Sequence, residues 1–510
     1  MAGIRRSGVL MHISSLPGRF GCGDLGEGAR AFARFLSGAG FSLWQTLPLS
    51  PTDPALGDSP YSSPSAFAGN YLFVSPELLR EEGLISREEE ERFKAASERL
   101  ADFGRASSCR KELLRAAWEN FREARGRFAE MRADFERFLS EEDFWLADYA
   151  LFRVLKEENC GRCWARWPRG FAFRDEAALA EFARRRGGEI LFVKFAQFLF
   201  YRQLSALSDC CARLGVTLFG DIPIYVAWDS ADVWANRELF DLNEDGTLRG
   251  KAGVPPDYFS KTGQLWGNPL YNWDAMKRDG FRWWRARMSH TLKHCGAVRI
   301  DHFRGLCAYW EVPADEETAA QGSWRPALGR EMLSALRGDV GAAELPLVAE
   351  DLGVITDDVR ALMEDFALPG MKVLMFAFGG GADNPYLPHN LPRRSVVYTG
   401  THDNDTVRGW WREGASEVEK KNFTAYTGVE ITEENAARAM ARMALSSRAD
   451  TAVIPMQDIL GLGSECRMNT PSLKYGSWRW RLLPGELDGA AEIGRLYREM
   501  NAIYGRCEEV

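Results

Sequence analysis

Three carboxylates stand at the ends of short apolar runs that lie far apart in the chain. Asp301 lies in AVRIDHFRG (297–305), Glu350 in PLVAEDLG (346–353) and Asp403 in VVYTGTHDND (396–405). In an eight-stranded α/β barrel the strand ends on one rim converge, so acids that are distant in sequence can meet in one pocket. Carboxylates gathered in this way perform glycoside chemistry. The spacing therefore predicts a site that acts on sugars.

The alternation of a strand places Arg299 and Asp301 on the same face. A guanidinium so close stabilises the ionised carboxylate, which suits a nucleophile that must be charged at neutral pH. The alternative interpretation is an inward ion pair that only fills the barrel.

Glu350 follows the run PLVA and is followed by Asp351. A carboxyl group at a strand end beside other acids and aromatics is expected to have a raised pKa, which suits a general acid. The alternative is that Glu350 or Asp351 caps the helix expected in ITDDVRALMEDF. Spacing alone does not separate the two acids.

The segment THDND places Asp403 beside His402 and Asn404 after an apolar run. One histidine among hard oxygen ligands lacks the spacing of a zinc site. Groups that hold sugar hydroxyls and distort the ring are the better interpretation. No metal or organic cofactor is expected, and His12 is expected to pack or to line a pocket.

The composition is that of a soluble globular protein: 510 residues, 45% hydrophobic and 27% charged. The net charge of -8 gives no general affinity for nucleic acid or anionic membranes. The N-terminus has no secretory pattern, and no run approaches the ~18 apolar residues of a membrane span. A cytoplasmic protein whose ten cysteines are free thiols is expected.

Eight short β-rich runs alternate with amphipathic stretches, which predicts a parallel sheet closed as a (β/α)8 barrel in a single catalytic domain, 1–510. The runs are 9–13, 42–49, 216–224, 297–303, 345–351, 371–378, 395–400 and 451–460.

Two gaps between these runs are too long for ordinary crossovers. Residues 77–205, after the second strand, are predicted to form a helical insertion subdomain, with capping-box spacings at Ser86/Glu89 and Ser140/Asp143. Its charged runs are interpreted as solvated helix faces. Residues 227–275 are rich in Trp, Asn, Gly and Pro and are predicted to be irregular aromatic loops over the cleft, suited to stacking on sugars.

Long motifs carry a resemblance over nearly the whole chain. They are SGVLMHISSLPG, DSPYSSPSAFAGN, GDIPIYVAWDSADVW, AGVPPDYFSKTGQLWGNPLY, VRIDHFRG, AEDLG, THDNDT and RMNTPSLKYGSWRWR. With these motifs the chain resembles the amylomaltases, the 4-α-glucanotransferases or disproportionating enzymes of glycoside hydrolase family 77 in the α-amylase superfamily.

The resemblance implies a retaining mechanism with Asp301 as nucleophile, Glu350 as acid/base and Asp403 as transition-state stabiliser. It also implies a barrel without a C-terminal β-domain, and maltooligosaccharides and α-1,4-glucans as donors and acceptors. The implied substrate-binding residues are Ser59, Tyr61, Asp221, Asp257, Tyr258, Phe259, Trp266, Arg299, His402 and Asn469.

The loop that contains RMNTPSLKYGSWRWR (467–481) is called here the late loop. Its Ser472 and Ser477 depart from the glycine and asparagine that the family commonly has there, which leaves acceptor preference and product size open. Three functions remain: transfer of glucan segments to a 4-hydroxyl group, hydrolysis by the same carboxylates, and glucan binding without catalysis. The three acids argue against the last. Aromatic loops that exclude water, together with the resemblance, favour transfer.

Overall fold

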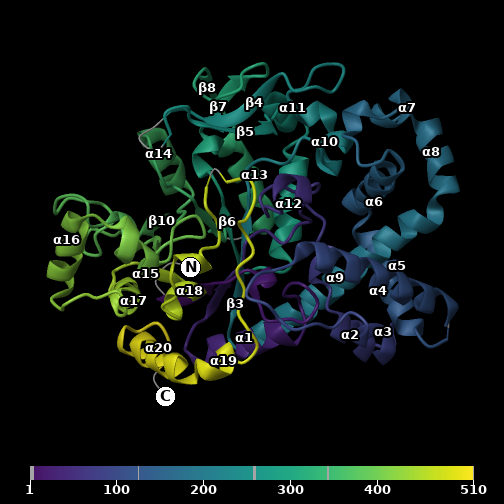
Figure 1. The fold of residues 1–510 in the computed structure, drawn as a ribbon. Helices are drawn as coiled ribbons and strands as arrows, with labels where there is room; N and C mark the ends of the chain where they lie inside the picture. The colour runs from purple at the N-terminus through teal and green to yellow at the C-terminus, as the bar shows by residue number, and fades with distance from the viewer. Residues whose placement is uncertain (1–4, 125, 257–259, 342–343, 472, 509–510) are drawn as a thin grey trace.

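The computed structural model describes residues 5–124, 126–256, 260–341, 344–471 and 473–508, and its centre is a closed barrel of eight parallel strands (Figure 1). Around the barrel the strand order is β1-β12-β11-β10-β9-β6-β3-β2. The strands are β1 (Arg6–Leu10), β2 (Leu43–Gln45), β3 (Thr217–Ile222), β6 (Ala297–Ile300), β9 (Leu347–Ala349), β10 (Gly370–Val373), β11 (Ser395–Tyr398) and β12 (Thr451–Pro455).

The prediction of the barrel is confirmed, because each of the eight apolar runs contains or overlaps one barrel strand. Strands that are covered on both faces need near-continuous apolar residues, and this is the signal that the runs carry. All residues of β6, β9, β11 and β12 are buried.

The register of three neighbouring strands brings the first two acids together. Asp221 on β3 is level with Arg299 on β6, and Ile300 on β6 is level with Ala349 on β9. Asp301 and Glu350 each follow the last residue of their strand. The two acids therefore leave the barrel side by side on one rim.

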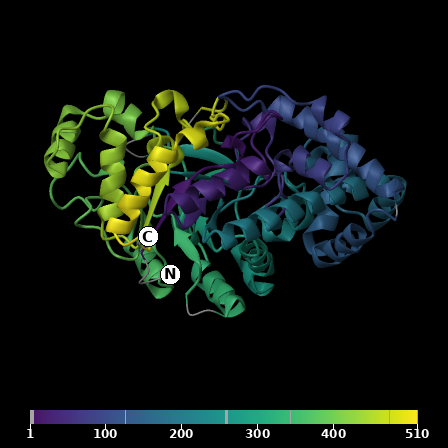
Figure 2. The same ribbon diagram turned by 90° about the horizontal axis from the view of Figure 1, so that it is seen from below.

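The chain between β2 and β3 is mostly helical and lies to one side of the barrel (Figures 1 and 2). Its α-helices are α2 (Pro76–Glu81), α3 (Arg87–Glu91), α4 (Phe103–Glu123), α5 (Ala129–Glu141), α6 (Asp143–Glu158), α7 (Arg169–Ala172), α8 (Glu176–Arg185) and α9 (Gly187–Arg213). The capping box of Ser86 and Glu89 is confirmed. The one predicted at Ser140 and Asp143 is wrong, because α5 continues through Ser140 and Glu142 occupies the N-cap of α6.

A second sheet of four strands lies above the barrel in Figure 1, in the order β5-β4-β7-β8. Its strands are β4 (Gly250–Val254), β5 (Gln264–Pro269), β7 (Ala308–Pro313) and β8 (Ser323–Pro326). The prediction that 227–275 is irregular is thus wrong for β4 and β5. Glycines and polar residues weaken the strand pattern there. β4 forms backbone pairs with β5 on one side and with β7, distant in sequence, on the other.

After β12 the described residues contain helices and no further strand: α18 (Met456–Ile459), α19 (Glu486–Gly489) and α20 (Ala491–Ile503). The expected lack of a C-terminal β-domain therefore holds for residues up to 508, Ser472 apart. Helix α20 packs on α1 (Glu27–Gly38), and Arg506 Nη1 donates to the carbonyl of Arg6 at 2.6 Å. The segment after α20 therefore contacts the first residue of β1.

Two clusters of buried apolar side chains run through the molecule, and each joins barrel strands to helices of the insertion. The first contains Val9 of β1 and Phe195 of α9, and the second contains Ile300 of β6 and Trp145 of α6. Such shared packing supports the prediction of one catalytic domain with 77–205 and 227–275 as insertions. In the described ranges no helix is long and apolar enough to cross a membrane.

Candidate active site

Arg299 connects two carboxylates at the carboxyl ends of β3 and β6. Its Nη1 lies 2.6 Å from Asp221 Oδ2, and its Nη2 lies 2.6 Å from Asp301 Oδ1. The side chains of Arg299 and Asp221 are buried, whereas that of Asp301 is 32% exposed. Arg299 thus forms the inward ion pair with Asp221 and also reaches Asp301 at the rim.

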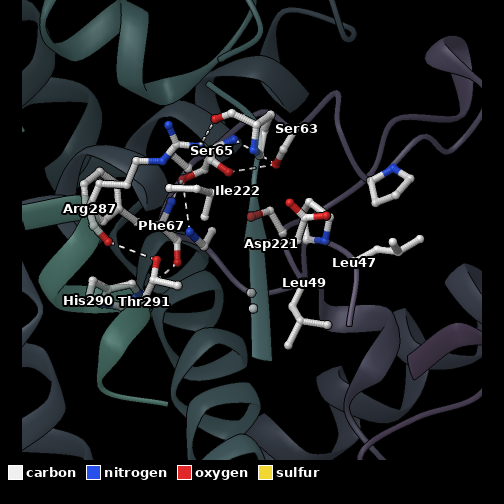
Figure 3. Close-up of a pocket in the computed structure, with 18 of the residues that line it drawn as sticks. Leu47, Leu49, Ser63, Ser65, Phe67, Asp221, Ile222, Arg287, His290 and Thr291 are labelled. Atoms are coloured by element: carbon white, nitrogen blue, oxygen red, sulfur yellow. Dashed lines mark hydrogen bonds between the residues drawn. The ribbon is translucent and has the colours of Figure 1, made fainter. Parts of the chain in front are cut away.

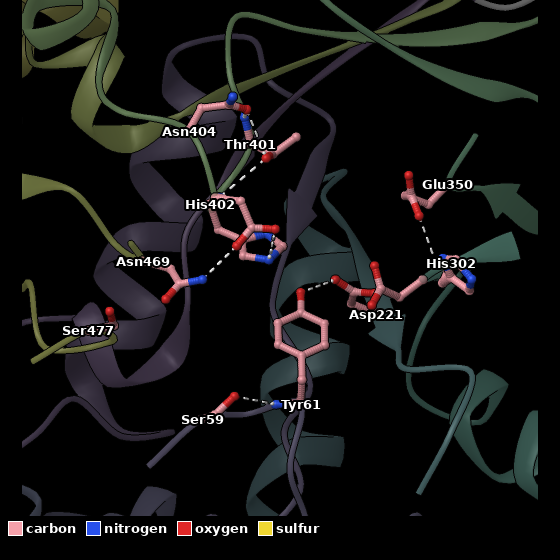
Figure 4. Close-up of polar contacts among 12 residues, drawn as sticks. Ser59, Tyr61, Asp221, His302, Glu350, Thr401, His402, Asn404, Asn469 and Ser477 are labelled. Atoms are coloured by element: carbon pink, nitrogen blue, oxygen red, sulfur yellow. Dashed lines mark hydrogen bonds and ion pairs between the residues drawn. The ribbon is translucent and has the colours of Figure 1, made fainter. Parts of the chain in front are cut away.

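Asp221 and Tyr61 fix the position of the Arg299 guanidinium. The Tyr61 hydroxyl donates to Asp221 Oδ2 at 2.7 Å, and the Tyr61 amide donates to Ser59 Oγ at 3.3 Å (Figure 4). Burial raises the pKa of Asp221, and the charge of Arg299 opposes that rise. Burial also opposes the charge of Arg299, but the two aspartates hold its pKa well above its usual value. A buried cation thus stays beside Asp301.

Glu350 has its carboxylate held by two backbone amides. Oε2 accepts from the His302 amide and Oε1 from the Leu352 amide, both at 2.8 Å. Burial, and after it the charge of Asp301, raise the pKa of Glu350 to about 7. A carboxyl group in this state exchanges a proton near neutral pH, as predicted for a general acid.

Asp351 has a different environment, which separates the two adjacent acids. Its Oδ2 lies 2.9 Å from Lys372 Nζ, and its Oδ1 accepts from the Met371 amide at 2.6 Å. The next helix, α14 (Asp357–Asp365), has Thr356 at its N-cap. The alternative that Glu350 or Asp351 caps this helix is therefore wrong.

Asp403 is held in the loop after β11 by residues of the late loop. Asn469 Nδ2 donates to Asp403 Oδ1 at 2.6 Å, and His402 Nε2 lies 3.3 Å from Asp403 Oδ2. Arg467 Nη2 donates to the Asp403 carbonyl at 2.5 Å. The Asp403 side chain is 47% exposed, so it is available to a ligand.

Aromatic rings join the Asp403 side of the site to the Arg299 side. The rings of Tyr61 and His402 stack with centroids 5.1 Å apart, and Trp478 lies 5.9 Å from Tyr61 and 5.8 Å from His402. Figure 4 shows Tyr61 between Asp221 and His402. His12 is buried and lines a small cavity with His402, and burial lowers the pKa of His12 to about 3, so it is neutral.

Trp266 of β5 lies on the other side of the site, over His302. The two rings meet edge to face with centroids 4.7 Å apart, and Trp266 is 37% exposed. His302 in turn donates its amide to Glu350, so Trp266 marks the Glu350 side of the cleft. Asp257, Tyr258 and Phe259 lie outside the described residues, as does Ser472. Ser477 Oγ accepts from the Thr470 amide at 3.2 Å and closes the base of the late loop.

Known proteins that are similar to this chain indicate one family. The 4-alpha-glucanotransferase family matches over residues 11–486. The chain belongs to this family. It is 47% identical to a 4-alpha-glucanotransferase of Thermus thermophilus, covering 97% of this chain and 98% of that one. It is 44% identical to that of Aquifex aeolicus, covering 99% and 100%. The amylomaltase of Streptococcus agalactiae, solved with acarbose, has a TM-score of 0.93 at 36% identity, covering 99% and 100%.

The candidate site of this 4-α-glucanotransferase also contains three residues that were not predicted from the sequence. His302, Arg467 and Trp478 all contact predicted site residues. Each stands in a quoted motif, VRIDHFRG or RMNTPSLKYGSWRWR, so the motifs carried the signal. These residues contact the site through a backbone amide, a backbone carbonyl and a ring. Residue type alone does not predict such contacts.

A cavity of about 90 Å³, lined by Asp221 and Tyr61 among others, lies between the barrel and helices α9 and α12 (Arg282–Leu292). Figure 3 shows Asp221 on one side of it and His290 on the other. Phe67, Ile222 and His290 are among its lining residues. Within the described part of the chain, Asp221 Oδ1 accepts no hydrogen bond. A cavity of this size has room for a few water molecules beside the Asp221 carboxylate.

Proposed function

We propose that the chain transfers an α-1,4-glucan segment with retention of configuration, through a covalent glycosyl-enzyme intermediate formed on Asp301. The observation that supports this most is the contrast between two acids at adjacent strand ends. Asp301 pairs with a buried cation, whereas Glu350 has its pKa raised to about 7. A retaining reaction needs one ionised carboxylate and one that gives and takes a proton.

In the first step Asp301 attacks the anomeric carbon of the donor, and the glycosidic bond breaks as Glu350 protonates the leaving 4-oxygen. In the second step the ionised Glu350 takes the proton from the 4-hydroxyl group of the acceptor, whose oxygen displaces Asp301. The same residue acts as acid and then as base, so the enzyme returns to its starting state.

Asp403 is proposed to stabilise the oxocarbenium-like transition state between these steps. Asn469 and His402 hold its carboxylate, and its partial exposure lets it reach sugar hydroxyls. Tyr61, Asp221, Arg299 and His402 form the wall of the donor subsite, and Ser59 supports Tyr61. The proposed contacts of Asp257, Tyr258 and Phe259 stay predictions from the resemblance.

Trp266 supports transfer over hydrolysis. An exposed indole on the Glu350 side offers an acceptor sugar a stacking surface close to the group that activates its hydroxyl. A bound acceptor also displaces water from the intermediate. Maltooligosaccharides and α-1,4-glucans are the proposed donors and acceptors, in line with the acarbose bound to the Streptococcus agalactiae amylomaltase.

A cytoplasmic location is part of this proposal. All ten cysteines are free thiols, with Cys22, Cys109, Cys211 and Cys466 buried. Thiols persist unpaired in a reducing compartment.

Incubation with maltotriose and separation of the products tests the proposed function. Glucose together with a ladder of longer maltooligosaccharides is the expected result. New reducing ends without elongation would identify a hydrolase, and binding without any product would identify a glucan-binding protein.

A further inference from the structure

A buried carboxylate ties together both ends of the loop that carries Asp403. Asp458 lies in α18, directly after β12, and is 2% exposed. Its Oδ2 accepts from Thr399 Oγ1 at 2.6 Å, and its Oδ1 accepts from the Val407 amide at 2.8 Å. Thr399 follows the last residue of β11, and Val407 is the first residue of α15 (Val407–Gly409). One side chain therefore sets the separation of the two loop ends.

The loop between these ends is held by its own hydrogen bonds. Asn404 Oδ1 accepts from the Thr401 amide at 2.8 Å, and the Asp403 amide donates to Thr401 Oγ1 at 3.3 Å. Thr406 Oγ1 accepts from the Gly409 amide at 3.1 Å and caps α15. A turn braced in this way moves as a unit, so the place of Asp403 over the barrel follows from the place of the loop ends.

Burying the Asp458 carboxylate in this position lowers the stability of the folded protein. Burial raises its pKa to about 6, and within the described ranges no lysine or arginine forms an ion pair with it. An apolar residue would avoid the desolvation penalty of a buried carboxylate. Its two short hydrogen bonds do what an apolar residue cannot, because they join a hydroxyl group on one loop end to an amide on the other.

The consequence for catalysis follows from the geometric tolerance of transition-state stabilisation. A shift of about 1 Å in a reacting or stabilising group can lower the rate roughly 100-fold. Asn469 and His402 contact the carboxylate of Asp403, whereas Asp458 contacts the Thr399 hydroxyl group and the Val407 amide. Asn469 and His402 therefore hold the middle of the loop, whereas Asp458 holds both of its ends.

We infer that Asp458 is a positioning residue for transfer, which acts through Thr399 and Val407 to hold Asp403 at the reacting sugar. This inference rests on the proposed role of Asp403. Thr399→Val removes one of the two bonds with little change of shape, and Asp458→Asn removes the charge and keeps the size. Both variants are expected to lower kcat roughly 10- to 100-fold with KM changed less than about threefold.

A double-mutant cycle separates positioning from general support of the fold. Thr399→Val is made in the native protein and in Asp403→Asn. Activity is measured with α-maltosyl fluoride as donor, because its reactive leaving group keeps the low rates of these variants measurable. If the hydroxyl group acts through Asp403, its removal costs less than about twofold in the Asp403→Asn background. Equal losses in both backgrounds would overturn the inference.

Ser395→Ala is the matched control. Ser395 is buried at the opposite end of the same strand, and its Oγ donates to the Pro392 carbonyl at 2.6 Å. We expect it to lower the melting temperature as Thr399→Val does and to leave kcat unchanged; an equal loss of kcat in this control would also overturn the inference. If Asp403→Asn by itself keeps full activity, the proposed role of Asp403 is wrong instead. If Thr399→Val does not fold, Asp458→Asn completes the same cycle.

Discussion

Arg299 and Asp301 form a 2.6 Å ion pair at the end of one strand, with the arginine buried and the aspartate at the rim. Residues two positions apart in an extended strand lie on the same face, so this pair forms without any long-range contact. The contact with Asp221 of the neighbouring strand holds the guanidinium in place. This arrangement supports the proposal that Asp301 is the nucleophile.

Asp301→Asn is expected to lower turnover by more than about a thousandfold while glucan binding survives, because the amide is a poor nucleophile of similar shape. A fluorinated glycosyl donor that traps the intermediate should label Asp301 in the native protein, as read by peptide mass spectrometry. A label on Asp351 or Asp403 would contradict the assignment.

The pKa of Glu350 predicts an alkaline limb in the pH profile. Glu350 must be protonated to protonate the leaving oxygen, so kcat/KM for maltotriose is expected to fall as pH rises through about 7. Fluoride leaves without a proton, so kcat/KM for α-maltosyl fluoride should stay flat through the same range. An identical limb with both donors would assign the titration to another group.

Glu350 also predicts a pH-dependent stability. Its pKa is raised in the folded state, so the folded protein binds the proton more tightly than the unfolded chain and loses stability as pH rises from about 4.5 to 7. The free energy of unfolding of Glu350→Gln, relative to the native protein, should therefore increase by roughly 1–3 kcal/mol over that range. Urea unfolding at pH 5 and pH 8 measures it.

The exposed Glu413 supplies the control for this measurement, because its side chain is 64% exposed. Glu413→Gln should show the same stability difference at both pH values. A flat difference for Glu350→Gln would mean that burial does not destabilise the ionised Glu350.

Trp266→Ala is expected to lower transfer more than hydrolysis, because the indole over His302 holds the acceptor and excludes water. The ratio of elongated products to new reducing ends should fall roughly 3- to 10-fold, in line with the ~1 kcal/mol of a stacking contact. Both rates are measured on one maltooligosaccharide over a range of acceptor concentrations.

Trp324 of β8 provides a matched substitution. It is 41% exposed on the same sheet, meets the Trp310 ring edge to face, and has the Arg304 guanidinium over its own ring. Trp324→Ala should leave the ratio unchanged. A parallel loss of transfer and hydrolysis in Trp266→Ala would mean that Trp266 only packs its loop.

The barrel strands and the three acids could be predicted because both depend on local sequence. A strand buried on both faces must be apolar along its length, and a charged residue directly after it must lie at the rim. β4, β5, β7 and β8 were missed as strands because their pattern is weak, and because the pairing of β4 with β7 joins segments distant in sequence. The sequence also could not show which of the adjacent acids Glu350 and Asp351 is the acid of the site. Their tertiary partners distinguish them: Glu350 accepts from the His302 amide, whereas Asp351 pairs with Lys372.

The sequence by itself determined the fold class, the family and the position of each acid after an apolar run, because periodicity and motifs are properties of neighbouring residues. Only the tertiary structure decided that Glu350 has its pKa raised to about 7 while Asp351 pairs with Lys372. It also decided that Asp458 spans the loop of Asp403. These properties depend on burial and on distances between strands, and such quantities exist only after the chain has closed into a barrel.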